Sequence, residues 1–337
     1  MRRYITFLIL LIAVNYSCTK DIVDDRATYV DVFDSFWHIM DERYVFFEEK
    51  NVDWDSVYED YKPKFKEVKY YHQAIDLFEE IILELNDGHI SVTTYWHHVI
   101  SVSGIDTLNA LPYLNYEKIY ERYQLNNIRE YPKVHIGQLN NSITYLRPLY
   151  GLDKISSADV GLANYEHKNG VILDLRDCMG GNSEGLGLLD GFFEGNKDLY
   201  YRQYKNGKEH HNFTKKYSVK LEGLGTVSSE TPIVVLINDN TYSMGNFMAS
   251  VMKDITACKL VGQKTGGGGG CVISVYLNGG WSLTYTFDRV YNLSGELIED
   301  GILPDIEVLK SKDFWENDHQ ETGEDPQLEK ALEVLLF

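Results

Sequence analysis

The stretch Ile233-Val-Val-Leu-Ile-Asn-Asp-Asn-Thr-Tyr-Ser243-Met-Gly-Asn246 joins an apolar run to a short polar turn and then to a helical pattern. The apolar run predicts a buried strand over 233–237, and the spacing beyond it predicts a helix over about 243–256. Ser243 would open that helix, where free N–H groups and the helix dipole favour a developing negative charge. The same position also suits an ordinary helix-capping serine. The stretch alone therefore leaves both a nucleophile and a cap open.

Strand and helix patterns alternate on both sides of this stretch. The sequence predicts strands over 143–146 and 171–175, helices over 155–167 and 183–194, and a hairpin over 272–288. Asp325 is expected to cap a last helix that has Pro326 in its first turn. Alternating strands and helices indicate an α/β fold with a mostly parallel sheet covered on both faces. Three helical stripes between 27 and 86 predict a small helical bundle in front of it.

Three other short segments hold residues that could take part in chemistry. The strand at 171–175 leads to Gly180-Gly181, and glycines there let backbone N–H groups approach a ligand closely, although a tight turn explains them equally well. His89 follows the helix-breaking Asn86-Asp87-Gly88. The segment 295–305 carries several carboxylates, which by themselves suit a solvated loop.

Charge and cysteine content exclude several classes of function. The formal net charge of −19 argues against a nucleic-acid partner, because phosphate binding needs clustered Lys and Arg. Cys178, Cys258 and Cys271 have no spacing that suits a disulfide framework or a zinc site, so we expect buried thiols, no metal and no cofactor. Asp174 and Arg176 suit a structural ion pair. The glycine run 266–270 lacks the Lys-Ser/Thr of a phosphate loop and is expected to be a mobile loop near the active site.

The first residues have the pattern of a secretory signal. Arg2 and Arg3 precede an apolar run over 5–14, which is too short to span a bilayer. The run ends in Ser17-Cys18, which resembles a bacterial lipoprotein signal in which the cysteine is lipidated, although a plain signal peptide is the alternative. We therefore expect a chain anchored to the membrane by lipid at Cys18, in the bacterial cell envelope and facing the periplasm or the surface.

Taken together and in order, these segments resemble the tail-specific, or C-terminal processing, serine peptidase family, which includes the tricorn core protease. The resemblance covers most of 27–337 and rests on Val52-Asp-Trp54, Asp87-Gly-His89, Asp174-Leu-Arg176 with Gly180-Gly181, Thr241-Tyr-Ser243, Gly262-Gln-Lys-Thr265-Gly, Gly301-Ile-Leu-Pro-Asp305 and Asp325-Pro-Gln-Leu-Glu-Lys-Ala. The family implies a sheet-and-helix core of the crotonase and Clp-protease type.

The resemblance offers two catalytic variants. One branch uses a Ser–Lys dyad, but the lysine position is Gly268 here, and Lys264 is a poor substitute. The tricorn-like branch uses Ser, His and Glu, which implies Ser243 as nucleophile, His89 as base and Glu299 as the third member. The N–H groups of Met244 and of Gly180 or Gly181 would then bind the oxyanion.

The chain departs from its relatives at several positions. Glu299 lies two residues before Gly301, where many relatives place the acid three before, so Glu296 and Asp300 remain alternatives. Asn246 stands where relatives often have Glu, and Cys178 where Asn is usual. The segment between His89 and the first core strand is too short for a PDZ module, so peptide recognition through a PDZ groove is not expected.

We therefore expect a peptidase that hydrolyses envelope or imported polypeptides. The alternatives are a catalytically inactive relative that binds a peptide or hydrophobic ligand, and a hydrolase or isomerase acting on small esters or thioesters. The oligomeric state is not predicted. The expected division of the chain is a lipoprotein-type signal peptide over 1–17, a tether over 18–26, a helical subdomain over 27–95, a connecting segment over 96–140 and the catalytic core over 141–337.

Overall fold

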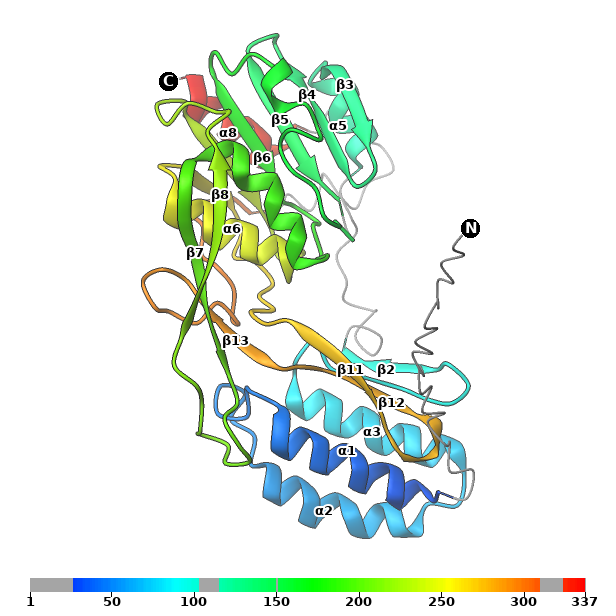
Figure 1. Cartoon of the computed structure of the whole chain (residues 1–337). Coiled ribbons are helices and arrows are strands. Elements are labelled where there is room, and N and C mark those ends of the chain that lie inside the picture. Colours follow the sequence, from blue (N-terminus) through cyan, green and yellow to red (C-terminus); the bar gives the residue numbers. More distant parts are fainter. Residues whose placement is uncertain (1–26, 103–114, 150, 310–323, 337) are drawn as a thin grey trace, which may run out of the picture.

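The computed structural model describes residues 27–102, 115–149, 151–309 and 324–336. The molecule has a lower unit of helices covered by a small sheet, and an upper unit built around a larger sheet (Figure 1). The expected signal peptide, Cys18 and tether lie outside the described residues, as does most of the acidic stretch 313–324. Within the described ranges, no helix combines the length and the apolar character needed to cross a membrane.

Three amphipathic helices form the lower unit, which confirms the predicted bundle. They are α1 (Tyr29–Arg43), α2 (Trp54–Glu67) and α3 (Tyr71–Leu85). Thr28 and Asp53 cap the first two, each accepting a hydrogen bond from a backbone N–H of the first turn. The apolar stripes meet in one aromatic core, in which Phe33 stacks on Phe65 at 4.6 Å between ring centroids.

A four-stranded antiparallel sheet lies against this bundle. Its strand order is β11 (Val272–Tyr276), β12 (Ser282–Thr286), β1 (Ser91–Thr93) and β2 (Val99–Ser101). The predicted hairpin over 272–288 is therefore confirmed. Its alternation places Leu283 and Tyr285 of β12 in the core of the bundle. A hairpin from the second half of the chain thus completes the N-terminal unit.

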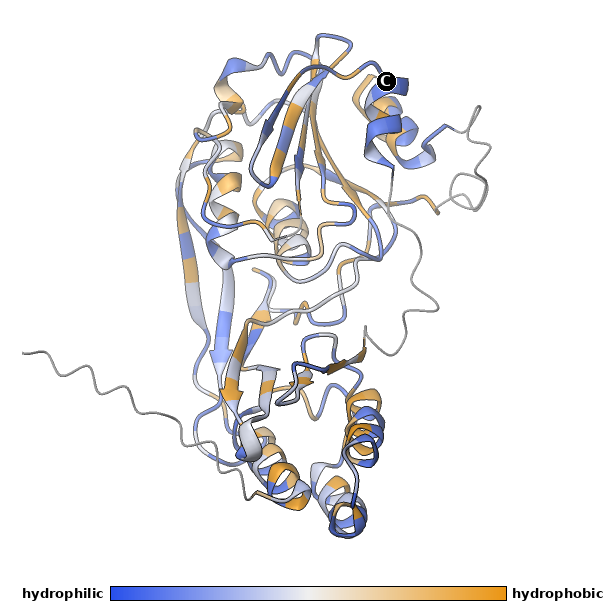
Figure 2. Cartoon of the chain, turned by 90° about the vertical axis from the view of Figure 1, so that its right-hand side faces the viewer, coloured by the Kyte–Doolittle hydropathy of each residue, from blue (hydrophilic) through white to orange (hydrophobic). Residues whose placement is uncertain are grey.

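The upper unit contains a seven-stranded mixed sheet. The order is β14 (Ile306–Glu307), β10 (Lys259–Gly262), β9 (Ile233–Ile237), β6 (Gly170–Asp174), β5 (Ile143–Pro148), β4 (Val134–Leu139) and β3 (Asn126–Tyr131). The first five strands run parallel to one another. β4 pairs antiparallel with β5, and β3 pairs antiparallel with β4. The hydropathy colouring shows hydrophobic residues along the central strands (Figure 2). This confirms the predicted α/β class, with a sheet-and-helix core preceded by a small helical bundle.

Helices cover the sheet at two main places. The predicted helix after 243 is α6 (Met244–Ile255), and Asp325 caps the closing helix α8 (Pro326–Leu336) by accepting the Leu328 N–H at 3.1 Å. The short helix α5 (Tyr116–Arg122) lies in the segment that the sequence left unassigned.

The helix predicted over 155–167 is wrong. This segment is mostly turns with one short 3₁₀ helix, η1 (Leu162–Asn164), because Gly161 has a positive φ of 62° and interrupts the turn that Ser156 and Asp159 begin. The helical segment predicted over 183–194 is confirmed as a 3₁₀ helix, η2 (Ser183–Phe192), which ends two residues before the strand that begins at Glu194.

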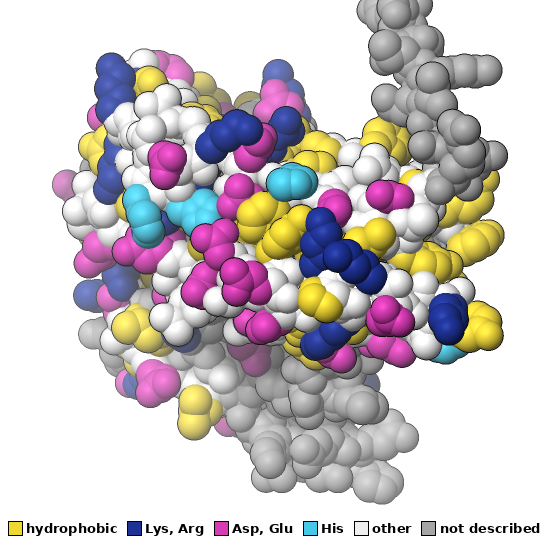
Figure 3. Space-filling model, turned by 90° about the horizontal axis from the view of Figure 1, so that it is seen from below, with side chains coloured by type: hydrophobic (Ala, Val, Ile, Leu, Met, Phe, Trp, Pro, Cys, Tyr) yellow, Lys and Arg dark blue, Asp and Glu magenta, His cyan; other side chains and the backbone are white. Residues whose placement is uncertain are grey.

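A long three-stranded ribbon connects the two units. Its strands are β7 (Glu194–Tyr204), β8 (Tyr217–Leu224) and β13 (Asp288–Tyr291), and the loop between β7 and β8 reaches down to the bundle (Figure 1). There His210 Nε2 lies 2.7 Å from Asp41 Oδ1 of α1. Seen from below, His side chains lie beside Asp and Glu side chains (Figure 3).

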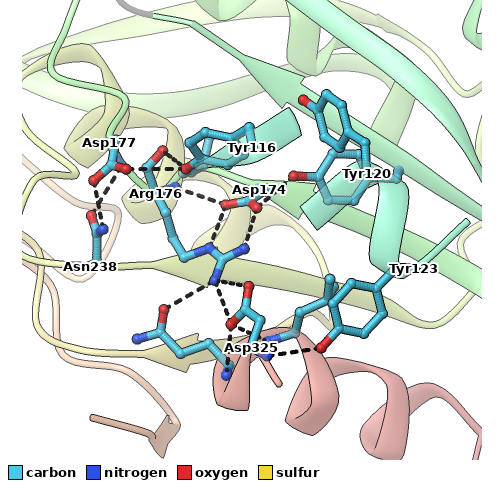
Figure 4. Close-up of polar contacts among 12 residues, drawn as sticks. Tyr116, Tyr120, Tyr123, Asp174, Arg176, Asp177, Asn238 and Asp325 are labelled. Carbon is cyan, nitrogen blue, oxygen red and sulfur yellow. Dashed lines mark hydrogen bonds and ion pairs between the residues drawn. The ribbon is translucent and has the colours of Figure 1, made fainter. Parts of the chain in front are cut away.

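A buried charge network joins β6 to α8. Arg176 is fully buried and binds Asp174 through Nε at 2.9 Å and Nη2 at 2.7 Å, while its Nη1 contacts Asp325 at 2.7 Å (Figure 4). Tyr145 also donates to Asp174, at 2.7 Å. Burial alone would lower the pKa of Arg176, but the two carboxylates raise it well above its ordinary value. The structural ion pair expected of Asp174 and Arg176 is confirmed, with Asp325 as a third member.

Candidate active site

Ser243 occupies a sharp turn between β9 and α6. Its backbone has φ 51° and ψ −114°, a conformation that costs a non-glycine residue roughly 1–3 kcal/mol. The Ser243 N–H donates to the Gly267 carbonyl at 2.9 Å, and its own carbonyl accepts the Phe247 N–H at 2.9 Å. The turn therefore holds a strained serine firmly at the first turn of a helix.

The Ser243 hydroxyl does not cap that helix. The side chain accepts no hydrogen bond from the first turn of α6, whereas Thr28, Asp53 and Asn115 each cap their helices through their side chains. This removes the capping explanation that the sequence left open. A strained strand-to-helix turn that exposes a serine without a capping role is the geometry of a nucleophile elbow.

Gly180 lies directly beside the elbow. A methyl group on Gly180 would be 3.1 Å from Ser243 Cβ, 3.4 Å from its Oγ and 3.8 Å from the Met244 backbone nitrogen. Met244 is the first residue of α6, so its N–H has no intrahelical partner. The Gly180 N–H interacts with the thiol of the buried Cys178, which is a weak acceptor. The structure thus places the double-glycine segment and the helix N-terminus around the serine.

His89 approaches the elbow from the lower unit. Its ring lies 4.9 Å from the ring of Tyr242, the residue before Ser243. Its backbone N–H donates to Asp87 Oδ1 at 2.8 Å, and Asp87 Oδ2 accepts from Tyr44 at 2.8 Å, which fixes the backbone at the start of β1. Burial lowers the pKa of His89, so the imidazole is neutral at pH 7. Its Nδ1 is buried and has no partner in the described part of the chain.

The glycine run packs between these residues rather than forming a mobile loop. Gly267 to Gly270 are buried, and a methyl group on Gly268 would lie 2.6 Å from Tyr242 Cζ and 3.0 Å from His89 Cε1. The expected mobile loop is therefore wrong. Only glycine fits here, because Gly268 has φ 79° and no space for a side chain. The lysine of the Ser–Lys branch would not fit at this position, and Lys264 is exposed.

Glu299 is the buried acid of its segment, whereas Glu296 and Asp300 are exposed. Glu299 Oε2 accepts the Gly269 N–H at 2.7 Å, and Oε1 lies 2.9 Å from Lys50 Nζ. Burial and the nearby Asp87 charge raise the pKa of Glu299 to about 7, against the opposing effect of Lys50.

The expected site residues thus gather around one point from distant parts of the chain, although not all of them touch. Among the described residues, no hydrogen bond joins Ser243 to His89 or His89 to Glu299. Catalytic hydrogen bonds are often long in unliganded proteins and tighten when substrate binds. No group of three or more His, Cys, Asp or Glu residues in the described ranges is placed to hold a metal ion.

Sequence reasoning missed Lys50 and the role of Tyr242. Lys50 lies in the turn after α1, within a charged stretch that looks like ordinary surface. No pattern in the sequence marks it, because its partner Glu299 is 249 residues away in the chain. Tyr242 was visible only as a neighbour of Ser243.

Family models match two parts of the chain. Residues 153–308 match the model of peptidase family S41, and residues 25–82 match the C1 domain of tricorn protease. The carboxy-terminal processing protease CtpA of Bacillus subtilis is 30% identical over 141 residues, which is 41% of this chain and 28% of that protein. Over the matched residues, the chain resembles the S41 family of C-terminal processing peptidases.

Other relatives agree with this resemblance. A carboxy-terminal-processing protease of Bartonella bacilliformis is 27% identical over 51% of this chain and 40% of its own length. The matches thus span less than half of these curated relatives. The crystal structure described as a putative peptidase from Parabacteroides merdae has a TM-score of 0.80 with 26% identity, covering 92% of this chain and 98% of that one. Mature CPAF shares the fold, with a TM-score of 0.64 at 12% identity over 86% and 94% of the two chains.

Proposed function

We propose that this chain is a serine peptidase that hydrolyses polypeptides, with Ser243 as nucleophile, His89 as general base and Glu299 as the acid of the triad. The observation that carries the proposal is the strained Ser243 elbow, whose hydroxyl caps nothing and which faces Gly180 and a helix N-terminus. Of the three acids that the sequence left open, the buried Glu299 is favoured, because it is held beside the glycine run that contacts His89.

The chemistry follows from these positions. The neutral His89 imidazole would take the proton of the Ser243 hydroxyl as Oγ bonds to the substrate carbonyl carbon. The N–H groups of Met244 and of Gly180 or Gly181 would bind the resulting oxyanion. His89 would return the proton to the amine as the C–N bond breaks, and water would then hydrolyse the acyl-enzyme by the same route. The Glu299 carboxylate would stabilise the imidazolium.

A comparative digest tests this function. The protein without its first 18 residues is incubated with an unfolded-proteome peptide mixture, beside the Ser243→Ala and His89→Ala variants, and new termini are read by mass spectrometry. We expect new termini with the wild type and none with either variant. Activity on small acyl esters without new peptide termini would favour an esterase or thioesterase. A folded wild type without either activity would favour a peptide-binding relative.

Substitution of Gly180 tests the oxyanion site. A methyl group there would crowd Ser243 Oγ, and the alanine would have to keep the positive φ of 132° that Gly180 adopts. Gly180→Ala should therefore lower kcat by about 10²-fold. Gly207→Ala is the matched control, because Gly207 also has a positive φ, 102°, but only the Asn212 side chain lies near, at 3.8 Å. Steady-state kinetics on a peptide substrate measure both. If both variants lost kcat to the same extent, backbone strain would explain the effect, and an oxyanion role for this segment would be contradicted.

We also propose that Cys18 carries a lipid that anchors the protein in the bacterial cell envelope. The support is the apolar run over 5–14 followed by Ser17-Cys18. In a bacterial host, the full chain should incorporate a radiolabelled fatty acid and sediment with membranes, and Cys18→Ala should do neither. Equal labelling of the two chains would refute the assignment. The natural polypeptide substrates would then lie in the envelope.

A further inference from the structure

We propose that Lys50 is a positioning residue of the peptidase site, which holds the Glu299 carboxylate ionised and oriented toward the reactive centre. The inference rests on the proposed function and adds a residue from the helical unit to it. Lys50 Nζ lies 2.9 Å from Glu299 Oε1, and the Gly269 N–H holds the other oxygen at 2.7 Å. A carboxylate oxygen has two acceptor sites, so Glu299 can keep both partners and still accept from His89.

Burial makes this ion pair important to Glu299. The side chains of Lys50 and Glu299 are 14% and 3% exposed, so water screens their interaction little. A carboxylate in such surroundings becomes neutral unless a cation or donor compensates for the lost hydration. Asp87 adds a second negative charge nearby, which makes ionisation of Glu299 still harder.

Lys50 faces these charges from a fixed turn. Arg289 of β13 donates to the Val45 carbonyl at 2.9 Å and pairs with Glu49 at 2.6 Å, and the Lys50 N–H donates to the Phe46 carbonyl at 2.9 Å. Pairing costs the Lys50 side chain rotamer freedom, but these bonds already order the backbone of the turn, so no backbone entropy is lost in addition. The helical unit thereby supplies a cation to the carboxylate beside the glycine run.

The titratable groups around Glu299 set the expected pH dependence. They are Lys50 after α1, Tyr44 in the same turn, Asp87 before β1, and Tyr242 at the elbow. Lys50 also faces His89, whose pKa is lowered by burial and by the Lys50 charge. Burial raises the pKa values of the two tyrosines, so they stay neutral. The Glu299 charge raises the pKa of Lys50, although burial by itself lowers it, so the ammonium persists. Lys50 is therefore the cation that opposes the effects of burial and of Asp87 on Glu299.

Removal of this cation should make Glu299 titrate at higher pH. Glu299 must be ionised to stabilise the imidazolium, so activity rises with pH through its pKa. In Lys50→Met the acidic limb of kcat/KM against pH should move up by about one pH unit or more. Activity at pH 7 should fall about fivefold or more and recover substantially near pH 9, whereas Lys50→Arg should keep most of the wild-type profile.

Two controls separate positioning from general damage. Lys64→Met removes an exposed lysine of the same helical unit, 3.4 Å from Glu80, and should leave the profile unchanged. In a Glu299→Gln background, Lys50→Met should cause little further loss, because the two residues act through one carboxylate. An unshifted acidic limb in an active, folded Lys50→Met variant would overturn the proposal while leaving the peptidase function intact. If Lys50→Met lost activity at all pH values and melted at a lower temperature, and Lys50→Arg did not restore either property, Lys50 would have a structural role instead.

Discussion

Alanine at Ser243 should lower kcat for peptide hydrolysis by about 10⁴-fold or more, and alanine at His89 by a similar factor. The strained elbow presents the only nucleophile of the proposed mechanism, and the neutral, partly buried imidazole is its base. The double variant should be no slower than either single one, because the two residues act as a unit. These rate constants are measured by steady-state kinetics on one peptide identified in the digest, with the concentration of active wild-type enzyme determined by active-site titration.

Matched substitutions exclude an effect of folding. Ser229→Ala and His72→Ala change exposed residues of the same types and should keep wild-type rates. The Ser243 and His89 variants should melt within a few degrees of the wild type, because within the described residues the Ser243 hydroxyl caps no helix and His89 Nδ1 has no hydrogen-bond partner. Retention of more than about a tenth of wild-type kcat by Ser243→Ala would contradict its role as nucleophile.

Substitution of Arg176 should produce the largest loss of stability. Arg176→Met leaves Asp174 and Asp325, both buried, without their cation, and removing one partner of a buried ion pair typically costs about 3–5 kcal/mol of unfolding free energy. Arg176→Lys should restore only part of it, because an ammonium cannot reproduce the forked contacts to two carboxylates. Urea unfolding, followed by circular dichroism, measures the difference.

Arg122 provides the surface comparison. It pairs with Glu324, the neighbour of Asp325, but at 3.7 Å and with side chains 37% and 69% exposed. Arg122→Met should change the unfolding free energy by less than about 0.5 kcal/mol, because solvent screens exposed pairs. Similar losses for the two arginines would show that the buried network does not stabilise the junction of β6 and α8. If Arg176→Met does not accumulate as folded protein, the lysine variant still gives a measurable difference.

Local patterns predicted most of the elements. The run 233–237 became β9 at the expected residues, since continuous apolar β-branched residues suit a strand buried on both faces. The three helical stripes of the bundle and the 272–288 hairpin were equally clear. The helix predicted over 155–167 failed because Gly161 takes a left-handed backbone conformation, with φ 62°, which ends the first turn after Ser156.

The site was predictable only in part. Ser243, His89 and Glu299 were named from motifs in the sequence, and the structure brings their segments together around the glycine run. Whether Ser243 was a cap or a strained elbow depended on its backbone angles, which a sequence does not give. The packing of Gly267 to Gly270 also appeared only in three dimensions, since composition alone favours mobility for such a run.

The sequence by itself therefore determined the class of fold, the element that carries the serine and the acidic character that argues against nucleic acid, because these follow from local periodicity and composition. Only the tertiary structure decided that the β11–β12 hairpin completes the N-terminal unit, that Glu299 rather than Glu296 or Asp300 is buried, and that Lys50 is its partner. The physical reason is the range of the interactions. Strand pairing and the pairing of buried charges join residues hundreds of positions apart, and no local pattern records which of them will meet.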